Sequence, residues 1–232
     1  MSGDSSTHII KQILSLGARI KTHKVGTMAE LEARFGMFLG GRYLPKVPQS
    51  FFEATLEHIQ SQTMSGGKHE TMDVFYGHQH RCTVEHNSDD FCILPTHWCK
   101  TRVAHMILHN EHYGIGIKIS LNKERLLKSS NVPMLVKTTH CRIKERYSYC
   151  FSNWRVDFTK VWSGRTVSKA EHSCLHDKPT HEIEIELIDP KHLKSENPDD
   201  LVEQLYHMIY SFIPPHITLK TDEISLFNVE LK

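Results

Sequence analysis

Three glutamates at alternate positions are the residues of this sequence best suited to chemistry. The stretch T-H-E-I-E-I-E-L at residues 180–187 places Glu182, Glu184 and Glu186 between apolar residues. A β-strand sends alternate side chains to opposite faces, so the three carboxylates share one face of a strand. On a solvated sheet this alternation needs no functional explanation. On an enclosed face the carboxylates need a positive partner, and their oxygens suit Mg²⁺ or Mn²⁺.

A second pair of glutamates lies near the start of the chain. In A-E-L-E-A-R-F-G at residues 29–36, Glu30, Glu32 and Arg34 share one strand face and apolar side chains take the other. The sequence thus supplies two separate glutamate strands. Together they predict a site for a divalent cation bound through oxygen.

Basic side chains gather on strand faces between the two glutamate strands. They are Arg81, Lys100, Lys118, Arg142, Lys144, Arg146 and Arg155, with Glu124 and Asp157 on the same faces as Lys118 and Arg155. Clustered lysines and arginines are suited to holding a polyphosphate. A metal that bridges acidic and basic groups polarises the terminal phosphorus and orients or activates a water for in-line attack. The pattern therefore predicts metal-dependent chemistry on a phosphate chain.

The elements that must position these residues are mainly strands. Residues 4–16, 48–62 and 198–212 have helical patterns, whereas residues 163–179 have the composition of a polar loop. The expected strands lie at 29–36, 70–76, 79–86, 90–94, 98–108, 112–122, 137–149, 153–161, 180–187 and 223–231. This order predicts a mainly β (α+β) fold, an antiparallel sheet with helices packed outside, in one domain over residues 1–232.

The alternation also indicates which way the strand faces point. If every polar face met solvent, three exterior helices would have no apolar surface to cover. A sheet closed into a barrel of about eight antiparallel strands resolves this, because its apolar faces point outward and its polar faces line a tunnel. An internally neutralised network of ion pairs without a ligand is the alternative for such a lumen.

Composition limits the remaining classes of function. The chain has 232 residues, is 39% hydrophobic and carries a formal net charge of +1, so no global field indicates a nucleic-acid or membrane partner. No stretch is apolar and long enough for a membrane span, and the six cysteines show no disulfide framework. We expect a soluble, intracellular protein.

The glutamate motifs E-L-E-A-R and E-I-E-I-E resemble the two metal-binding motifs of the triphosphate tunnel metalloenzymes. Between them, I-K-I-S-L-N-K-E, R-I-K-E-R-Y-S-Y and W-R-V-D-F-T-K-V are similar to inner strands of the fungal and protozoan metal-dependent RNA triphosphatases of mRNA capping. The resemblance spans roughly residues 28–188 and implies a closed eight-stranded tunnel with a polar interior.

The resemblance also implies roles for individual residues. Glu30, Glu32 and Glu186 correspond to metal ligands, with Glu182 and Glu184 beside them. The seven lysines and arginines named above correspond to phosphate contacts or to supports of a basic wall. Glu124 and Asp157 correspond to essential acids, and we expect Glu124 to position the attacking water.

The implied activity is a Mg²⁺- or Mn²⁺-dependent hydrolysis of the γ-phosphate of 5′-triphosphate RNA, the first step of mRNA capping. Nucleoside triphosphates are expected as secondary substrates, an RNA guanylyltransferase is a candidate partner, and the nucleus is the expected location, with the cytoplasm left open. Because the sequence begins shortly before the first motif, we expect no long N-terminal extension of the kind that the resemblance associates with recruitment of guanylyltransferase in fungal relatives. An inorganic tripolyphosphatase or nucleotide cyclase of the same fold, and a non-catalytic sensor of polyphosphate or RNA ends, remain alternatives.

Overall fold

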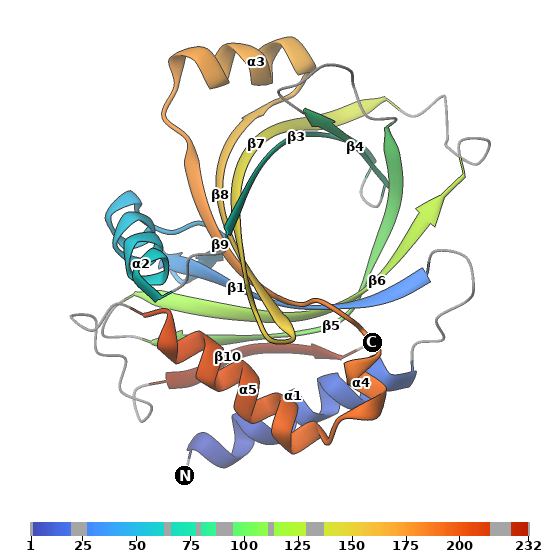
Figure 1. The fold of residues 1–232 in the computed structure, drawn as a ribbon, viewed down its shortest axis with the longest axis vertical. Coiled ribbons are helices and arrows are strands. Elements are labelled where there is room, and N and C mark those ends of the chain that lie inside the picture. Colours follow the sequence, from blue (N-terminus) through green and yellow to red (C-terminus); the bar gives the residue numbers. More distant parts are fainter. Residues whose placement is uncertain are drawn as a thin grey trace.

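Ten strands and five helices make up the part of the chain that the structure describes (Figure 1). The structure is a computed structural model that describes residues 2–19, 27–62, 66–77, 80–86, 95–110, 114–128, 137–213 and 224–231. The strands are β1 (Thr27–Leu39), β2 (Arg42–Leu44), β3 (Gly66–Tyr76), β4 (His80–His86), β5 (Thr96–Asn110), β6 (Ile115–Leu127), β7 (Thr138–Phe151), β8 (Trp154–Gly164), β9 (Thr180–Leu187) and β10 (Ile224–Leu231). The helices are α1 (Ser2–Arg19), α2 (Gln49–Gln62), α3 (Val167–His176), α4 (His192–Ser195) and α5 (Pro198–Ser211).

Eight of these strands close into an antiparallel barrel. The hydrogen-bonded order is β1, β6, β5, β4, β3, β7, β8 and β9, and β9 then pairs with β1. The remaining two strands lie outside this circle, since β10 extends the sheet beside β5 and the short β2 pairs with the end of β1. The predicted closed eight-stranded barrel is therefore confirmed.

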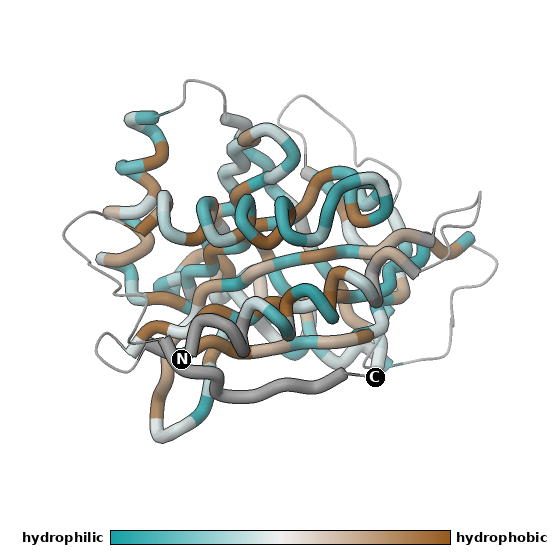
Figure 2. Tube along the Cα trace, turned by 90° about the horizontal axis from the view of Figure 1, so that it is seen from below, coloured by the Kyte–Doolittle hydropathy of each residue, from teal (hydrophilic) through white to brown (hydrophobic). Residues whose placement is uncertain are grey.

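The apolar faces of the strands point outward, as the alternation predicts. Leu31, Ala33 and Phe35 of β1 are buried in one large core, whereas Glu30, Glu32 and Arg34 face the lumen. Helices α1, α4 and α5 belong to the layer that covers this core below the barrel (Figure 1), and α2 packs beside β9. Figure 2 views the molecule from the side of this layer and shows hydrophobic and hydrophilic residues alternating along the chain. The helical layer is what allows the charged faces to turn inward.

The region 163–179 differs from the prediction of a polar loop. Strand β8 continues to Gly164, and α3 follows from Val167 to His176. Thr166 caps this helix, because its hydroxyl accepts a hydrogen bond from the backbone N–H of Lys169 at 3.3 Å. The helix covers a small second core of Val74, Cys82, Cys141 and Ala170 on the outside of the barrel. Its mostly polar sequence hid it, because Ala170 is its one fully buried residue.

Other boundaries differ by a few residues. The strand expected at 112–122 is β6, which starts after a turn at Gly114 and continues past Glu124. The sequence predicted three helices, which correspond to α1, α2 and α5, and it missed α3, α4 and β2. The expected strand at 90–94 lies outside the described residues. None of the described helices has the length and apolarity that a membrane span requires.

Candidate active site

The floor of the tunnel carries a cluster of carboxylates from two neighbouring strands. Glu30 and Glu32 project from β1, and Glu124 projects from β6, which pairs with β1. The ammonium group of Lys100 on β5 lies among the three and forms ion pairs with Glu30, with Glu32 at 3.4 Å and with Glu124 at 3.8 Å. The ammonium group of Lys100 therefore lies within ion-pair distance of all three carboxylates.

Asn122 fixes the two carboxylates of β1 against the neighbouring strand. Its side-chain amide donates hydrogen bonds to Glu30 Oε2 at 2.9 Å and to Glu32 Oε1 at 3.3 Å. Glu124 lacks such support, because its buried Oε1 atom accepts no hydrogen bond within the described part of the chain. A buried carboxylate oxygen without a donor is costly and is the kind of atom that a ligand or an ion satisfies.

The pKa values of these glutamates differ, because their neighbouring charges differ. Burial raises the pKa of Glu30, and the negative charges of Glu32 and Glu124 raise it further. Burial likewise raises the pKa of Glu186 to about 7, with Glu30 adding to the shift against the attraction of Arg155. Burial acts on Glu32 too, but Lys100 and Arg34 outweigh it and lower its pKa to about 2. Glu30 and Glu186 therefore take up a proton more readily than Glu32.

The opposite wall of the tunnel is basic. Arg142, Lys144 and Arg146 alternate along β7, and Arg155 of β8 lies on the same lumen-facing surface. Two acids are buried within this wall: Asp157 forms ion pairs with Arg146 and Arg155, and Asp73 of β3 forms one with Lys144. Arg81 of β4 lies between the two walls, 3.8 Å from Glu124. The cations are thus held in place by acids of their own wall.

Lys144 is the most confined of these cations. Burial and the positive charges of Arg142, Arg146 and Arg81 together lower its pKa to about 7, against the pull of Asp73. The same positive field acts on Asp73, where Lys144 and Arg81 outweigh burial and lower the pKa of the carboxyl. A polyanion that entered the lumen would relieve the repulsion among these cations.

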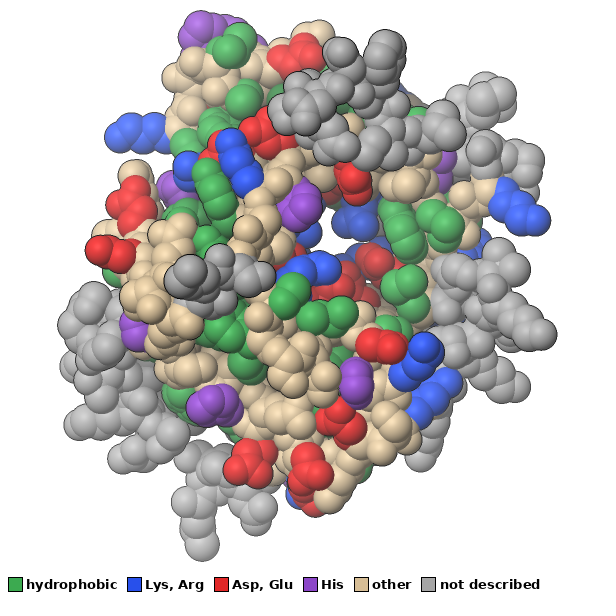
Figure 3. Space-filling model, viewed as in Figure 1, with side chains coloured by type: hydrophobic (Ala, Val, Ile, Leu, Met, Phe, Trp, Pro, Cys, Tyr) green, Lys and Arg blue, Asp and Glu red, His purple; other side chains and the backbone are tan. Residues whose placement is uncertain are grey.

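Ion pairs from β9 connect the two walls. Glu182 pairs with Arg142, Glu184 pairs with Arg34 and approaches Arg146 at 3.7 Å, and Glu186 pairs with Arg155. Figure 3, which looks along the tunnel, shows acidic and basic side chains around a central opening. The three glutamates of β9 therefore differ in their surroundings. The negative charges of Glu30 and Glu32 raise the pKa of Glu186.

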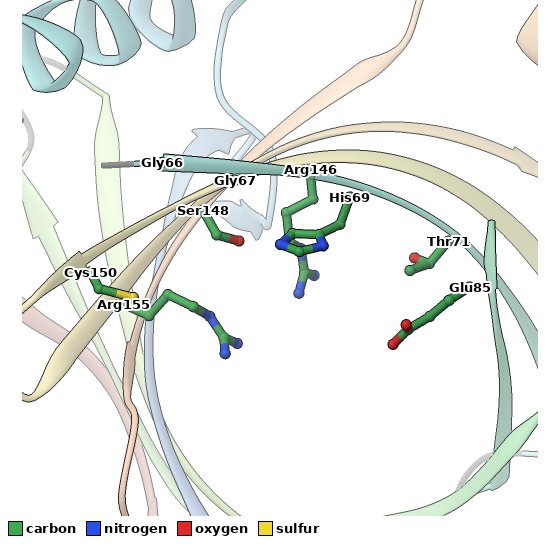
Figure 4. A pocket seen from close by; sticks show the side chains of 9 residues that line it. All are labelled: Gly66, Gly67, His69, Thr71, Glu85, Arg146, Ser148, Cys150 and Arg155. Carbon is green, nitrogen blue, oxygen red and sulfur yellow. The ribbon is translucent and has the colours of Figure 1, made fainter. Parts of the chain in front are cut away.

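A cavity of about 400 Å³ opens at one mouth of the tunnel. Its lining includes Arg146 and Arg155 from the basic wall, His69 and Thr71 from β3, and Glu85 from β4. Figure 4 shows the side chains of Arg146, Arg155 and Glu85 extending into the same space. At the start of β3, Gly66 and Gly67 leave this side of the cavity without a bulky side chain. We call this end of the barrel, where β3 begins and β7 ends, the front mouth.

Aromatic rings cover the floor at the other end. Gly36 of β1 and Gly116 of β6 are paired residues, and the rings of Tyr43 and Phe38 lie where their side chains would project. Tyr43 is fixed there, because its hydroxyl donates a hydrogen bond to the backbone carbonyl of Arg34 at 2.8 Å. Lys118 pairs with Arg34 near this end, farther along the floor than the carboxylate cluster.

The structure brings all the residues predicted for the site to the lumen. Sequence reasoning did not assign a role to Asn122, which orients two glutamates, or to Ser148, which donates a hydrogen bond to Asp157 at 2.7 Å. It also missed Asp73, the partner of Lys144. The alternation in T-M-D-V-F at 71–75 could have found Asp73, because it puts Thr71 and Asp73 on the polar face.

The donor set on the floor fits a hard divalent cation. Carboxylate oxygens of Glu30, Glu32, Glu124 and Glu186 are of the type that Mg²⁺ and Mn²⁺ bind. The buried Glu124 oxygen accepts no hydrogen bond within the described residues, and burial raises the pKa values of Glu30 and Glu186, which a bound cation would lower. Among the described residues, no three acidic, histidine or cysteine side chains are already arranged as ligands around one point. In the structure these oxygens face Lys100 and Arg155 instead.

A closed antiparallel barrel with carboxylates on one wall and lysines and arginines on the other defines a triphosphate tunnel protein. A family model described as "mRNA capping enzyme, beta chain" matches residues 49–213. The chain belongs to this family. The matched range contains every site residue discussed here from Asp73 to Glu186, and Glu30, Glu32 and Arg34 precede it.

Solved structures with the same fold include RNA triphosphatases. The chain is similar to the Pct1 RNA triphosphatase of S. pombe, with a TM-score of 0.67 and 16% identity over 91% of this chain and 93% of that one. It is also similar to the RNA triphosphatase domain of a mimivirus mRNA capping enzyme, with a TM-score of 0.55 and 15% identity over 90% and 96% of the chains. Pct1 in complex with the Spt5 CTD matches at a TM-score of 0.66 and 17% identity over 91% and 94%. No curated protein matches the sequence significantly.

Proposed function

We propose that this chain is a metal-dependent RNA 5′-triphosphatase that removes the γ-phosphate from triphosphate-terminated RNA and leaves a 5′-diphosphate end for cap addition. The observation that carries the proposal is the division of the lumen into an acidic floor and a basic wall within a chain of the capping family. Binding an anion alone needs no carboxylates, so the floor argues for chemistry rather than for sensing.

The basic wall would hold the phosphate chain. Arg142, Lys144, Arg146 and Arg155 offer donors from two adjacent strands, and guanidinium groups bind phosphate oxygens in pairs. Asp157 and Asp73 keep these cations in fixed positions before substrate arrives. Fixed donors around the γ-phosphate stabilise the charge that develops in the transition state.

The acidic floor would hold the metal ion, with Glu30, Glu32 and Glu186 as its ligands. When bound, Mg²⁺ or Mn²⁺ supplies Lewis-acid polarisation of the terminal phosphate. Glu182 and Glu184 would act from the same strand by orienting Arg142, Arg34 and Arg146. Glu124 has a buried oxygen beside this cluster that accepts no hydrogen bond within the described residues, so it is the group we expect to orient the attacking water.

Partners and location follow from this activity. The substrate would be the 5′-triphosphate end of a nascent transcript, with nucleoside triphosphates as weaker substrates. We further propose that residues 1–232 act as one catalytic domain, that an RNA guanylyltransferase takes over the product, and that the protein works in the nucleus, where transcripts are capped.

Release of labelled γ-phosphate from 5′-triphosphate RNA, a nucleoside triphosphate and inorganic tripolyphosphate, measured in parallel with Mg²⁺ and with Mn²⁺, tests the proposal. We expect kcat/KM to be highest for the RNA and hydrolysis to stop when the metal is chelated. A clear preference for tripolyphosphate would instead support the inorganic phosphatase, and cyclic nucleotide product would support the cyclase. Binding of RNA ends without any turnover would support the sensor.

A further inference from the structure

Three large apolar side chains lie on the lumen side of the strands at the front mouth. Trp98 lies two residues before Lys100 on β5, Leu126 lies two residues after Glu124 on β6, and Met28 lies two residues before Glu30 on β1. Side chains two residues apart on a strand share a face, so these three continue the faces that carry the acidic cluster. We call Met28, Trp98 and Leu126 the apolar rim.

Strand register places the members of the rim next to one another and next to charged site residues. Trp98 pairs with Leu126 on one side and with Arg81 on the other, and Met28 pairs with Glu124. The rim thus forms the outer edge of the floor, roughly 7 Å along each strand from the charged cluster.

The rim is accessible rather than part of a core. Met28 is 37% exposed and Leu126 is 42% exposed, and Trp98 is half-buried. Neither of the two hydrophobic clusters in the described part of the chain contains any of the three. Trp98 is oriented by a hydrogen bond from its indole N–H to the hydroxyl of Thr96 at 3.2 Å. An oriented and partly exposed indole at an opening is suited to stacking.

The position of the triphosphate decides what reaches the rim. When the γ-phosphate lies between the acidic floor and the basic wall, the nucleoside must extend toward one end of the barrel. At the far end, the rings of Phe38 and Tyr43 cover the floor. At the front mouth the cavity bounded by Arg146 and Arg155 is open. The front mouth is therefore the exit that we assign to the first nucleoside, which would pass the apolar rim.

We infer that the apolar rim is the binding site for the first nucleobase of the substrate, which stacks on the indole of Trp98 with Leu126 and Met28 beside it. The inference rests on the proposed RNA triphosphatase function. It adds a site for the nucleobase, a part of the substrate that the tunnel itself does not recognise. Stacking accepts any base, because every base has a π-face. It gives the site a means of preferring nucleoside-linked triphosphates to tripolyphosphate without requiring a particular sequence.

The outer face of β6 supports the same direction for the RNA. Lys123 and Arg125 are exposed on this face, and Lys128 is exposed just after the strand, two residues beyond Leu126. A chain that leaves the tunnel over the rim would bring its next phosphates near these cations, which would favour polyanion binding without sequence preference.

Steady-state hydrolysis by the full chain and its Trp98→Ala variant tests the inference with two RNAs. One is a short 5′-triphosphate oligoribonucleotide, and the other is the same oligonucleotide with an abasic first residue. Base stacking on an aromatic side chain changes affinity by roughly tenfold. We therefore expect Trp98→Ala to raise the KM of the normal RNA roughly tenfold and to leave the KM of the abasic RNA unchanged. Trp98→Phe, which keeps an aromatic face, should stay close to the wild type.

Two controls separate the rim from the tunnel and from folding. Leu175→Ala removes another exposed apolar side chain, 78% exposed on α3, and should change neither KM. The Ki of inorganic tripolyphosphate as a competitive inhibitor should be the same in the wild type and in Trp98→Ala, because tripolyphosphate has no base.

Several outcomes would overturn the inference. Equal losses for both RNAs would make Trp98 a structural part of the tunnel. No loss for either RNA would leave the rim as a surface for something other than RNA, such as a protein partner. If Trp98→Ala does not fold, equal KM values of the wild type for normal and abasic RNA would contradict base stacking. Failure of the wild type to hydrolyse any RNA would instead contradict the proposed function.

Discussion

Lys144 of β7 and Asp73 of β3 form a buried ion pair inside the basic wall of the tunnel. Both side chains are almost fully buried, and the register of β3 with β7 places Asp73 beside Arg142 and Thr71 beside Lys144. The pair therefore ties two strands together through the lumen, and it sets the charge state of the cation at the centre of the wall.

Removal of Asp73 should destabilise the fold more than removal of both partners. Asp73→Ala leaves Lys144 buried among three arginines without its carboxylate partner, and breaking a buried ion pair in this way costs about 3–5 kcal/mol. We expect the free energy of unfolding in urea to fall by that amount. The double variant Asp73→Ala with Lys144→Met should recover part of it, and a double variant less stable than Asp73→Ala would contradict this account.

The pKa of Lys144, lowered to about 7, predicts how substrate binding depends on pH. A triphosphate binds best to the charged ammonium, so above pH 7 the free protein must take up a proton on binding. The KM should then rise with pH, by up to about tenfold per unit, between pH 7 and pH 9. Lys144→Arg keeps the charge throughout this range, so its KM should rise less. Ionisation of the substrate affects the KM of both proteins equally, so it cancels in the comparison. Parallel profiles of KM against pH for the wild type and Lys144→Arg would contradict the prediction.

The lowered pKa of Lys144 should weaken substrate binding as the pH rises, but the same rise in pH should make the fold more stable. Lys144 titrates lower in the folded protein than its ordinary value of 10.5, so the unfolded chain binds more protons between pH 7 and 10.5. The free energy of unfolding should therefore gain a contribution that rises with pH through this range, and the cost of charging the buried amine is fully present below pH 7. Urea titrations of wild type and Lys144→Met at pH 7 and pH 9 measure it, since the variant should lack this contribution.

Gly116 should tolerate no side chain unless the ring of Phe38 is removed. A Cβ atom at this position would lie 2.4 Å from Phe38 and 3.1 Å from Tyr43. Gly116→Ala should lower the free energy of unfolding by about 1–3 kcal/mol, as expected for overpacking. The double variant with Phe38→Ala should show a favourable coupling energy in a double-mutant cycle. Simple additivity of the two changes would show that the ring moves aside at no cost.

The barrel and the lumen-facing residues could be predicted because strand alternation repeats in every segment. Glu30, Lys144 and Glu186 face one axis for the reason that the sequence suggests: apolar neighbours such as Leu31 and Ile185 need the helical layer outside. Pairing across the lumen could not be predicted, because it depends on register between distant strands. Nothing local to Asp73 indicates Lys144, and nothing local to Glu182 indicates Arg142. Helix α3 was missed because it covers a core of only a few residues.

Register also divides the three glutamates of β9, which the sequence treats alike. Burial and the charges of Glu30 and Glu32 raise the pKa of Glu186 to about 7, so a metal ion that bound there would displace a proton and favour its charged form. Glu182 is paired with Arg142, and this arginine outweighs burial and lowers the pKa of the glutamate. We therefore expect Glu186 to act on the metal and Glu182 to act on the phosphate chain through Arg142.

Three substitutions, each of which replaces one carboxylate with an amide, should separate these roles. Glu186→Gln and Glu30→Gln should raise the Mg²⁺ or Mn²⁺ concentration for half-maximal activity by at least roughly tenfold, because each removes a ligand. Glu182→Gln should leave the metal requirement unchanged and raise the KM for triphosphate RNA, because Arg142 loses its orienting partner. Glu70→Gln, on the exposed outer face of β3, is the matched control and should change neither. If Glu182→Gln shifted the metal requirement as far as Glu186→Gln, all of β9 would belong to the metal site and the division drawn from register would be wrong.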